Sequence, residues 1–280
     1  MADKSPVLAR PHIPKASTRL DAPDEAIADI RAQLDTTRLA GVMLCCATSY
    51  DFDALGPAIA SAFDCPVLAV ASEGELHFGH DQHSIIGVGF PSALFDVQAM
   101  HAWPVASTMQ AATALKAHDG GMLDQQDHLG LVCFDGRSEL REPLLSMGAV
   151  FDQLTLAGAA SGLVNGHGSV YAAGSFQENY AACMVLMSHV RFEPFSIEIE
   201  LSDLNAVDYQ LLVDALKKRM PDILFTLGFE DLQYRHQPCA STMDISSALN
   251  TLNMSGFSTT AQLVGREVRS RGVSGIVFGA

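Results

Sequence analysis

One arrangement of apolar runs and helix-like segments recurs three times along the chain. The first copy reads "AGVMLCCATSYD", "FDALGPAIASAF", "PVLAVASEGEL" and "SIIGVGF", while "HLGLVCFDG" opens the second copy and "PDILFTLGFED" opens a degraded third. Apolar strands joined through helices predict covered sheets, and strands joined across short glycine-containing loops predict hairpins. We therefore expect an α/β fold. Its mixed β-sheets carry helices on their outer faces and are built from repeated strand-helix-strand-strand units, which could stack as α-β-β-α layers.

The chain divides into three parts. Residues 1–20, rich in proline and basic residues, predict an extended lead-in. "DAPDEAIADIRAQLDTT" predicts a helix over about 23–37, because Ile27, Ile30 and Leu34 fall on one face. A strand-like "FSIEIEL" before a helix expected over about 203–219 favours a boundary near residue 200. We expect one domain over residues 21–200 and a second part over 201–280.

Composition excludes several classes of function. The net charge is −15, from 17 basic and 32 acidic residues, which disfavours nucleic acids and anionic membranes as partners. The longest near-continuous apolar run, "YAACMVLM", is far shorter than the roughly 20 residues of a membrane helix. The N-terminus also lacks the apolar stretch of a secretory signal. These features predict a soluble, cytoplasmic protein.

The second apolar run of each copy ends in small residues. These corner segments are residues 71–76 ("ASEGEL"), 157–162 ("AGAASG") and 258–263 ("STTAQL"). Ser72 aligns with Thr259, and Glu75 aligns with Gln262. Equivalent strand ends of packed repeats face the same way, so we expect the three corner segments to converge and line a ligand site. Its expected residues are Ser72, Glu73, Gly74, Glu75, Gly158, Ala160, Ser161, Thr259, Thr260 and Gln262.

The order of these motifs resembles a known family. "VMLCCATSYD", a helix, "PVLAVASEGEL", then "GLVCFDG", a helix and "LTLAGAASG" resemble the N-terminal part of the FIST sensory domain, and "GFSTTAQL" resembles a stretch of its C-terminal part. The resemblance covers nearly all of the chain after residue 20, with a shortened C-terminal part. Ala261 and Gln262 stand where the family has glycine and glutamate.

The resemblance implies a function without catalytic residues. FIST proteins are intracellular sensory modules that bind small molecules such as amino acids, and some relatives bind haem and sense nitric oxide. Because this chain shows no output domain, the resemblance implies a separate signalling partner, such as a histidine kinase or a cyclic-nucleotide enzyme. Haem would need an axial ligand, for which His189 and His236 are the candidates.

Other chemistry stays open at the first corner segment. Glu73 and Glu75 could form an acid–base pair, but acidic residues at a strand end are more often solvated. His77, His80 and His83 follow an HxxHxxH spacing that could bind zinc, with Glu75 or Asp81 as a fourth ligand, or could form a polar hairpin tip. An uncatalogued metal-dependent hydrolase is therefore a further alternative. The chain has no GxSxG, Walker A or HExxH motif.

The six cysteines predict no disulfide or metal cluster. They occupy positions 45, 46, 65, 133, 183 and 239 without a CxxC pair, and four of them fall inside apolar runs. Free cysteine behaves as a small buried apolar residue in such runs. We therefore expect reduced, buried thiols.

Overall fold

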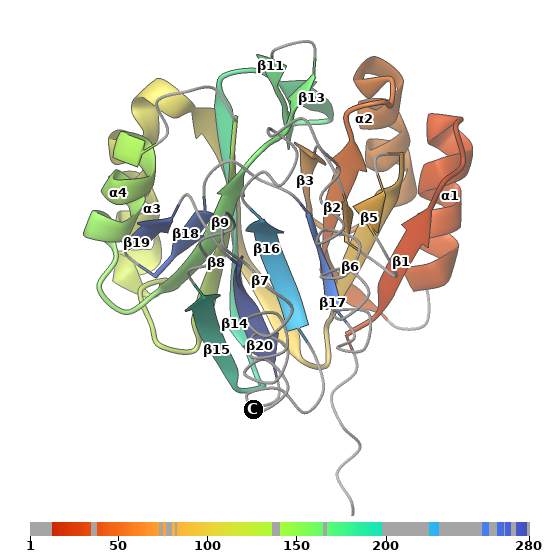
Figure 1. Ribbon diagram of the computed structural model, residues 1–280. Coiled ribbons are helices and arrows are strands. Elements are labelled where there is room, and N and C mark those ends of the chain that lie inside the picture. The colour runs from red at the N-terminus through yellow and green to blue at the C-terminus, as the bar shows by residue number, and fades with distance from the viewer. Residues whose placement is uncertain are drawn as a thin grey trace, which may run out of the picture.

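The computed structural model shows three six-stranded β-sheets around a common interior, with helices on the outside (Figure 1). This architecture confirms the α/β class, although three sheets rather than two face the core. The residues that the structure describes are 13–34, 38–72, 75–76, 80–81, 83–135, 141–164, 167–197, 224–229, 254–257, 262–265, 267–269 and 273–278.

Each sequence copy contributes one unit of the fold. The first unit contains β1 (Lys15–Thr18), α1 (Pro23–Leu34), β2 (Leu39–Ala47), α2 (Phe52–Ala62), β3 (Val67–Ser72), β4 (Glu75–Leu76), β5 (His80–Asp81) and β6 (Ile85–Pro91). The second contains β7 (Phe95–Pro104), α3 (Thr108–Ala117), β8 (His128–Phe134), α4 (Arg141–Val150), β9 (Thr155–Ala160), β10 (Leu163–Val164), β11 (His167–Gly168), β12 (Val170–Ala172), β13 (Ser175–Gln177) and β14 (Tyr180–Ser188), with 3-10 turns at Val105–Ser107 and His118–Gly121. The third contains β15 (Phe192–Ile197), β16 (Leu224–Phe229), β17 (Met254–Phe257), β18 (Gln262–Val264), β19 (Glu267–Arg269) and β20 (Val273–Phe278).

The three sheets share one strand order. It is β1-β6-β2-β3-β12-β13 in the first sheet, β7-β14-β8-β9-β18-β19 in the second and β15-β20-β16-β17-β4-β5 in the third. The first four strands of each sheet come from one unit, and the last two form a hairpin that belongs to another unit. The second unit contributes its hairpin to the first sheet, and the third unit contributes its hairpin to the second sheet. The first unit contributes its hairpin to the third sheet. The exchange therefore closes into a ring.

The pairing registers show that the units are equivalent. The hairpin strand from the other unit pairs with β3, β9 or β17 of the host unit through the pairs Val70↔Val170, Ala159↔Gln262 and Phe257↔Glu75. Glu75 and Gln262 thus occupy the same register position, as their sequence alignment predicts. In each unit β2, β8 or β16 also pairs in parallel with the next strand and antiparallel with the last one. The three units are consequently related by an approximate threefold arrangement.

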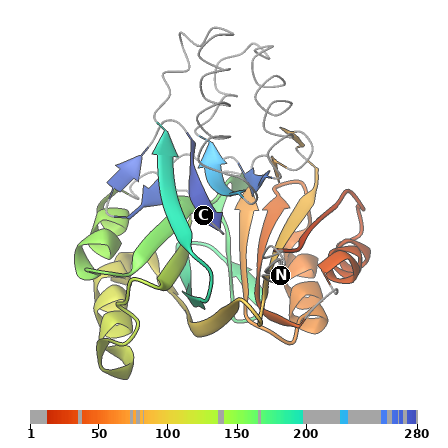
Figure 2. The same ribbon diagram turned by 90° about the horizontal axis from the view of Figure 1, so that it is seen from below.

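The inner faces of the three sheets form the central core. Strands of the first sheet contribute Met43 and Leu68, the second contributes Leu131 and Met184, and the third contributes Ile276, all at most 1% exposed. The helices cover the outer faces, with α1 and α2 over the first sheet and α3 and α4 over the second. Figure 2, seen from below, shows these helix pairs outside their sheets.

Local sequence explains the helix ends. Asp51 caps α2 and accepts hydrogen bonds from the backbone N–H groups of Asp53 (3.0 Å) and Ala54 (3.3 Å). In α1, Ile27, Ile30 and Leu34 are buried, which confirms the predicted face, and the helix ends at Leu34. β1 pairs with β6, so the segment predicted as a lead-in includes an edge strand. The helix expected over 203–219 lies outside the described residues. No described helix has the length and apolar character needed to cross a membrane.

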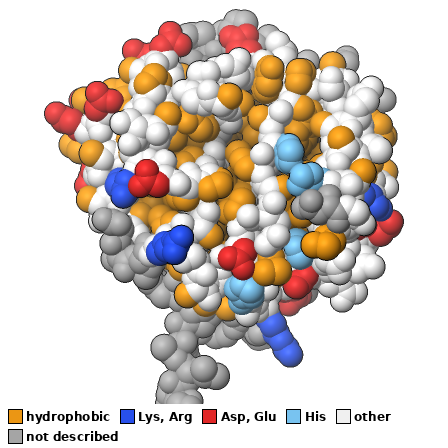
Figure 3. Space-filling model, turned by 180° about the vertical axis from the view of Figure 1, so that it is seen from behind, with side chains coloured by type: hydrophobic (Ala, Val, Ile, Leu, Met, Phe, Trp, Pro, Cys, Tyr) orange, Lys and Arg blue, Asp and Glu red, His pale blue; other side chains and the backbone are white. Residues whose placement is uncertain are grey.

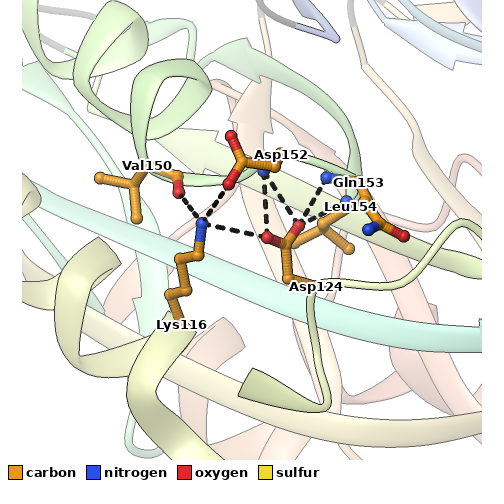
Figure 4. A network of polar contacts seen from close by, with 6 residues as sticks. All are labelled: Lys116, Asp124, Val150, Asp152, Gln153 and Leu154. Carbon is orange, nitrogen blue, oxygen red and sulfur yellow. Dashed lines mark hydrogen bonds and ion pairs between the residues drawn. The ribbon is translucent and has the colours of Figure 1, made fainter.

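One polar network ties two loops together at the end of α3 (Figure 4). The Asp124 carboxylate accepts hydrogen bonds from the backbone N–H groups of Asp152 (3.0 Å), Gln153 (2.7 Å) and Leu154 (2.8 Å). The Lys116 ammonium bridges the carboxylates of Asp124 (3.1 Å) and Asp152 (2.8 Å). Partial burial tends to raise the pKa of Asp124, but these donors lower it to about 2.

We predict that Asp124 makes the fold acid-sensitive. Its pKa in the folded chain, about 2, lies below the ordinary value of 3.8, so the folded state binds fewer protons than the unfolded chain. The stabilisation is complete above the ordinary value and is lost as pH falls from about 4 to about 2. Asp124→Ala should lose on the order of 2 kcal/mol at neutral pH. Denaturant unfolding at several pH values measures both effects, and an unchanged acid limb in the variant would contradict this role.

We also predict that Gly158 cannot take a side chain. A Cβ at this position would lie 2.3 Å from the Val132 carbonyl oxygen of the neighbouring strand. Gly158→Ala should therefore cost on the order of 3 kcal/mol, as other overpacked sites do. Gly41→Ala is the matched control, because its Cβ would meet side-chain atoms of Val97 and Met184 at 3.0 and 3.1 Å, which can shift. Thermal unfolding should show the larger loss for Gly158→Ala.

Candidate functional site

The corner segments stand at the carboxyl ends of β3, β9 and β17. Ser72 is the last residue of β3, and Ser161 directly follows β9. In the third corner segment residues 258–261 lie outside the described residues, but β17 and β18 on either side of them are described. Parallel strand ends with nearby loops are common places for ligands in α/β proteins.

Backbone pairing brings the corner segments together. Gly162 donates its N–H to the Ala71 carbonyl oxygen at 2.8 Å, which joins the second corner segment to the first. The pair Phe257↔Glu75 joins the third unit to the first corner segment. The pair Ala159↔Gln262 joins the third corner segment to the second. The predicted convergence is therefore confirmed for the described parts of these segments.

Buried polar groups collect at this end of the molecule. Ser72 is 0% exposed and Ser161 is 1% exposed, and both continue the inward alternation of Val70 and Ala159. Ser161 Oγ accepts a hydrogen bond from the backbone N–H of Ser169 at 3.1 Å. Two buried hydroxyls that can both donate and accept thus lie at the ends of β3 and β9. This chemistry suits recognition of a small polar molecule.

Two further polar residues adjoin the corner segments. Asp135 is 1% exposed, follows β8, and accepts a hydrogen bond from the backbone N–H of Asn179. Ser84 is 4% exposed and accepts from the Ala47 N–H through its carbonyl oxygen. No motif or spacing in the sequence singles out Ser84 or Ser169. The sequence does carry a signal for Asp135, because it ends the apolar run "GLVCFD" just as polar residues end the run "AGVMLCCATSYD" of the first copy.

The opposite end of the core is closed by aromatic rings. Phe95 packs edge-to-face on Phe90, with ring centroids 5.4 Å apart, and on Phe278 at 5.3 Å. Both contacts have the perpendicular geometry that aromatic pairs prefer. Polar and small groups at one end and aromatic packing at the other favour the corner end as the binding end.

The predicted site residues have unequal standing. Ser161 is buried beside the first corner segment, whereas Ala160 packs in the apolar cluster beneath α3 and α4 and Gly158 is needed for close packing against Val132. Glu75 and Gln262 are placed by their strand register alone. The remaining predicted residues lie outside the described part of the chain: Glu73, Gly74, Thr259 and Thr260.

His83 is held by two other groups. Its Nδ1 lies 2.6 Å from Ser49 Oγ, and its Nε2 lies 2.6 Å from Asp21 Oδ1. A metal ion at His83 would have to displace one of these contacts, which weakens the zinc alternative. His77 lies outside the described residues, and across the described residues no group of three or more metal-binding side chains forms. Figure 3 shows histidine side chains gathered on the face seen from behind.

Haem binding stays a prediction. His189, one of the two candidate axial ligands, is half exposed, and its Nε2 lies 2.9 Å from Asp96 Oδ2. Axial ligation uses a free ring nitrogen facing an enclosed cofactor, so His189 does not fit that role as it stands. His236 lies outside the described residues.

The predicted burial is confirmed for the four cysteines that fall inside apolar runs. Cys45, Cys46, Cys133 and Cys183 are buried, and Cys65 is half-buried. Burial raises the pKa of Cys183 to about 12 and raises that of Cys133 further. A thiol held in its protonated form is a poor nucleophile and metal ligand, so these residues serve packing.

Comparison with known proteins agrees with the corner-containing fold. No curated protein matches the chain. A family model described as the FIST N domain matches residues 40–199, which is more than half of the chain and includes the first and second corner segments. FIST domains are a family of small-ligand sensory domains. The motif order, the matched residues and the α/β fold together show that this chain belongs to the FIST family.

Proposed function

We propose that the chain is a sensory module that binds a small polar metabolite, such as an amino acid, at its corner segments. The observation that carries this proposal is the pairing of the corner segments, seen in the Gly162 N–H bond to the Ala71 carbonyl oxygen. It gathers strand ends from separate units at the polar end of the core. A ligand there would touch more than one unit at once.

The side chains near this end suit a zwitterion. In the proposed complex the Glu75 carboxylate receives an amine, and the Gln262 amide serves either end of the ligand. Their equivalent register positions, opposite Phe257 and Ala159, support a shared role. The buried hydroxyls of Ser72 and Ser161 add donors and acceptors at the ends of β3 and β9.

Signalling then requires two states of the chain. A ligand shifts such an equilibrium only by the difference between its affinities for the two states. Because the exchanged hairpins connect all three sheets, a ligand that spans two corner segments could change the relative positions of those sheets. In the proposal, a separate signalling protein of the histidine kinase or cyclic-nucleotide class senses that change.

We predict that a ligand of this class raises the melting temperature. A thermal-shift screen of amino acids and related metabolites should find one that stabilises the chain by about 2.7 kcal/mol at 100 times its dissociation constant. Glu75→Ala and Gln262→Ala should each raise, by at least tenfold, the ligand concentration that is needed for the same shift in melting temperature. Glu193→Ala, an exposed acidic residue on β15, is the control and should leave it unchanged.

Two results would count against this site. If no compound of the screen changes the melting temperature, the ligand class is wrong. If a ligand binds but the Glu75 and Gln262 variants respond like Glu193→Ala, the chain binds it elsewhere. Mass spectrometry of small molecules that copurify with the protein gives an independent identification.

A further inference from the structure

A serine, a histidine and an aspartate from three separate segments meet near the first corner segment. Ser49 follows β2, His83 precedes β6, and Asp21 precedes α1. Ser49 Oγ lies 2.6 Å from His83 Nδ1, and Asp21 Oδ1 lies 2.6 Å from His83 Nε2. Both distances fall within strong hydrogen-bond reach, so the three groups form a continuous relay.

The charge on Asp21 decides the direction of the relay. A carboxylate can only accept, so the neutral imidazole places its proton on Nε2 and donates it to Asp21. The Nδ1 lone pair then accepts the Ser49 hydroxyl proton. This is the arrangement of a nucleophile, a base and a group that orients the base, with the two ring nitrogens exchanged relative to the usual hydrolase triad.

The surroundings fix the imidazole and leave the hydroxyl accessible. The Tyr50 ring is stacked on His83, with centroids 5.0 Å apart and an interplanar angle of 6°, and the Tyr50 hydroxyl donates to the Leu20 carbonyl oxygen at 2.9 Å. Tyr50 is 5% exposed, whereas Ser49 is exposed. A reagent can therefore reach Ser49 Oγ while the buried Tyr50 ring holds the His83 imidazole in place.

We propose that Ser49 is a nucleophile for acyl transfer from carboxylic esters. Ser49 Oγ would form a bond to the acyl carbon as its proton passes to His83 Nδ1. The bond between the acyl carbon and the alkoxy oxygen then breaks, and the alkoxide leaves with the proton from His83. Water, activated by the same imidazole, later hydrolyses the serine ester and releases the carboxylic acid. No metal ion or redox partner is needed.

The base is the main source of acceleration in this site. Two backbone N–H groups in the first turn of α2, those of Asp53 and Ala54, already donate to Asp51 Oδ1. Stabilisation of the developing oxyanion by these two groups is therefore not available. General-base assistance alone is worth roughly 10²–10⁴-fold, so we expect slow acylation of one serine rather than fast turnover.

Acylation by p-nitrophenyl acetate tests the proposal on the full chain. Release of p-nitrophenolate gives the rate, and peptide mass spectrometry locates the acetyl group. Ser49 should be the main acetylated serine, and Ser49→Ala should remove that label. His83→Gln should slow labelling of Ser49 by roughly 100-fold, because only the base is lost.

His189→Gln is the matched control. His189 forms a comparable pair with Asp96, at 2.9 Å, and should leave the rate at Ser49 unchanged. Asp21→Asn covers the case in which His83→Gln unfolds, because the Asp21 side chain is 92% exposed and its loss leaves the fold intact. That variant should also slow labelling. Absence of label on Ser49, or a rate that neither His83→Gln nor Asp21→Asn reduces, would overturn the proposal.

Discussion

The exchange of hairpins between units is the constraint on which the rest of the structure depends. The last two strands of each sheet belong to another unit, and the three exchanged hairpins link the units in a closed ring. A unit on its own would therefore leave the edge of β3, β9 or β17 without its partner strand. Unpaired backbone groups at such an edge are costly when buried. The same pairing that completes the sheets holds the corner segments side by side, so stability and the candidate site have one origin.

The core around this ring has two unlike ends. Phe90, Phe95 and Phe278 interlock at one end. Buried hydroxyls of Ser72 and Ser161 lie at the other. An aromatic cluster packs tightly and excludes polar ligands, whereas small hydroxyl residues supply hydrogen-bond donors and acceptors. The corner segments lie at the end with the buried hydroxyls, at the carboxyl ends of β3 and β9.

Local patterns in the sequence predict much of this fold. Ile27, Ile30 and Leu34 identify the buried face of α1, Asp51 or Asp53 marks the start of α2, and the structure uses Asp51 as the cap. The repeated apolar runs likewise predict three equivalent units. The hairpin exchange could not be predicted, because β4 is a two-residue strand whose partner, β17, belongs to another unit far along the chain. No local propensity encodes a pairing between such distant short segments.

The site was predictable only where a residue's role is local. The alignment of Glu75 with Gln262 predicts their equivalent register positions. Gly158 is among the residues expected at the ligand site, but its lack of a side chain allows the close packing of its strand against Val132. His83 shows the limit more clearly, since its spacing from His77 and His80 indicates a metal site, whereas its ring contacts Ser49 and Asp21. Asp21, Ser49 and His83 follow no sequence motif, because only the fold brings them together.

Hydrogen exchange measured segment by segment tests the ring most directly. If the three units are interlocked, backbone amides of residues 67–72, 155–160 and 254–257 should exchange only through one shared opening. Added denaturant should then lower the protection of all three segments in parallel. Exchange of 254–257 through a separate opening of much lower free energy, with the other two segments still protected, would contradict the account.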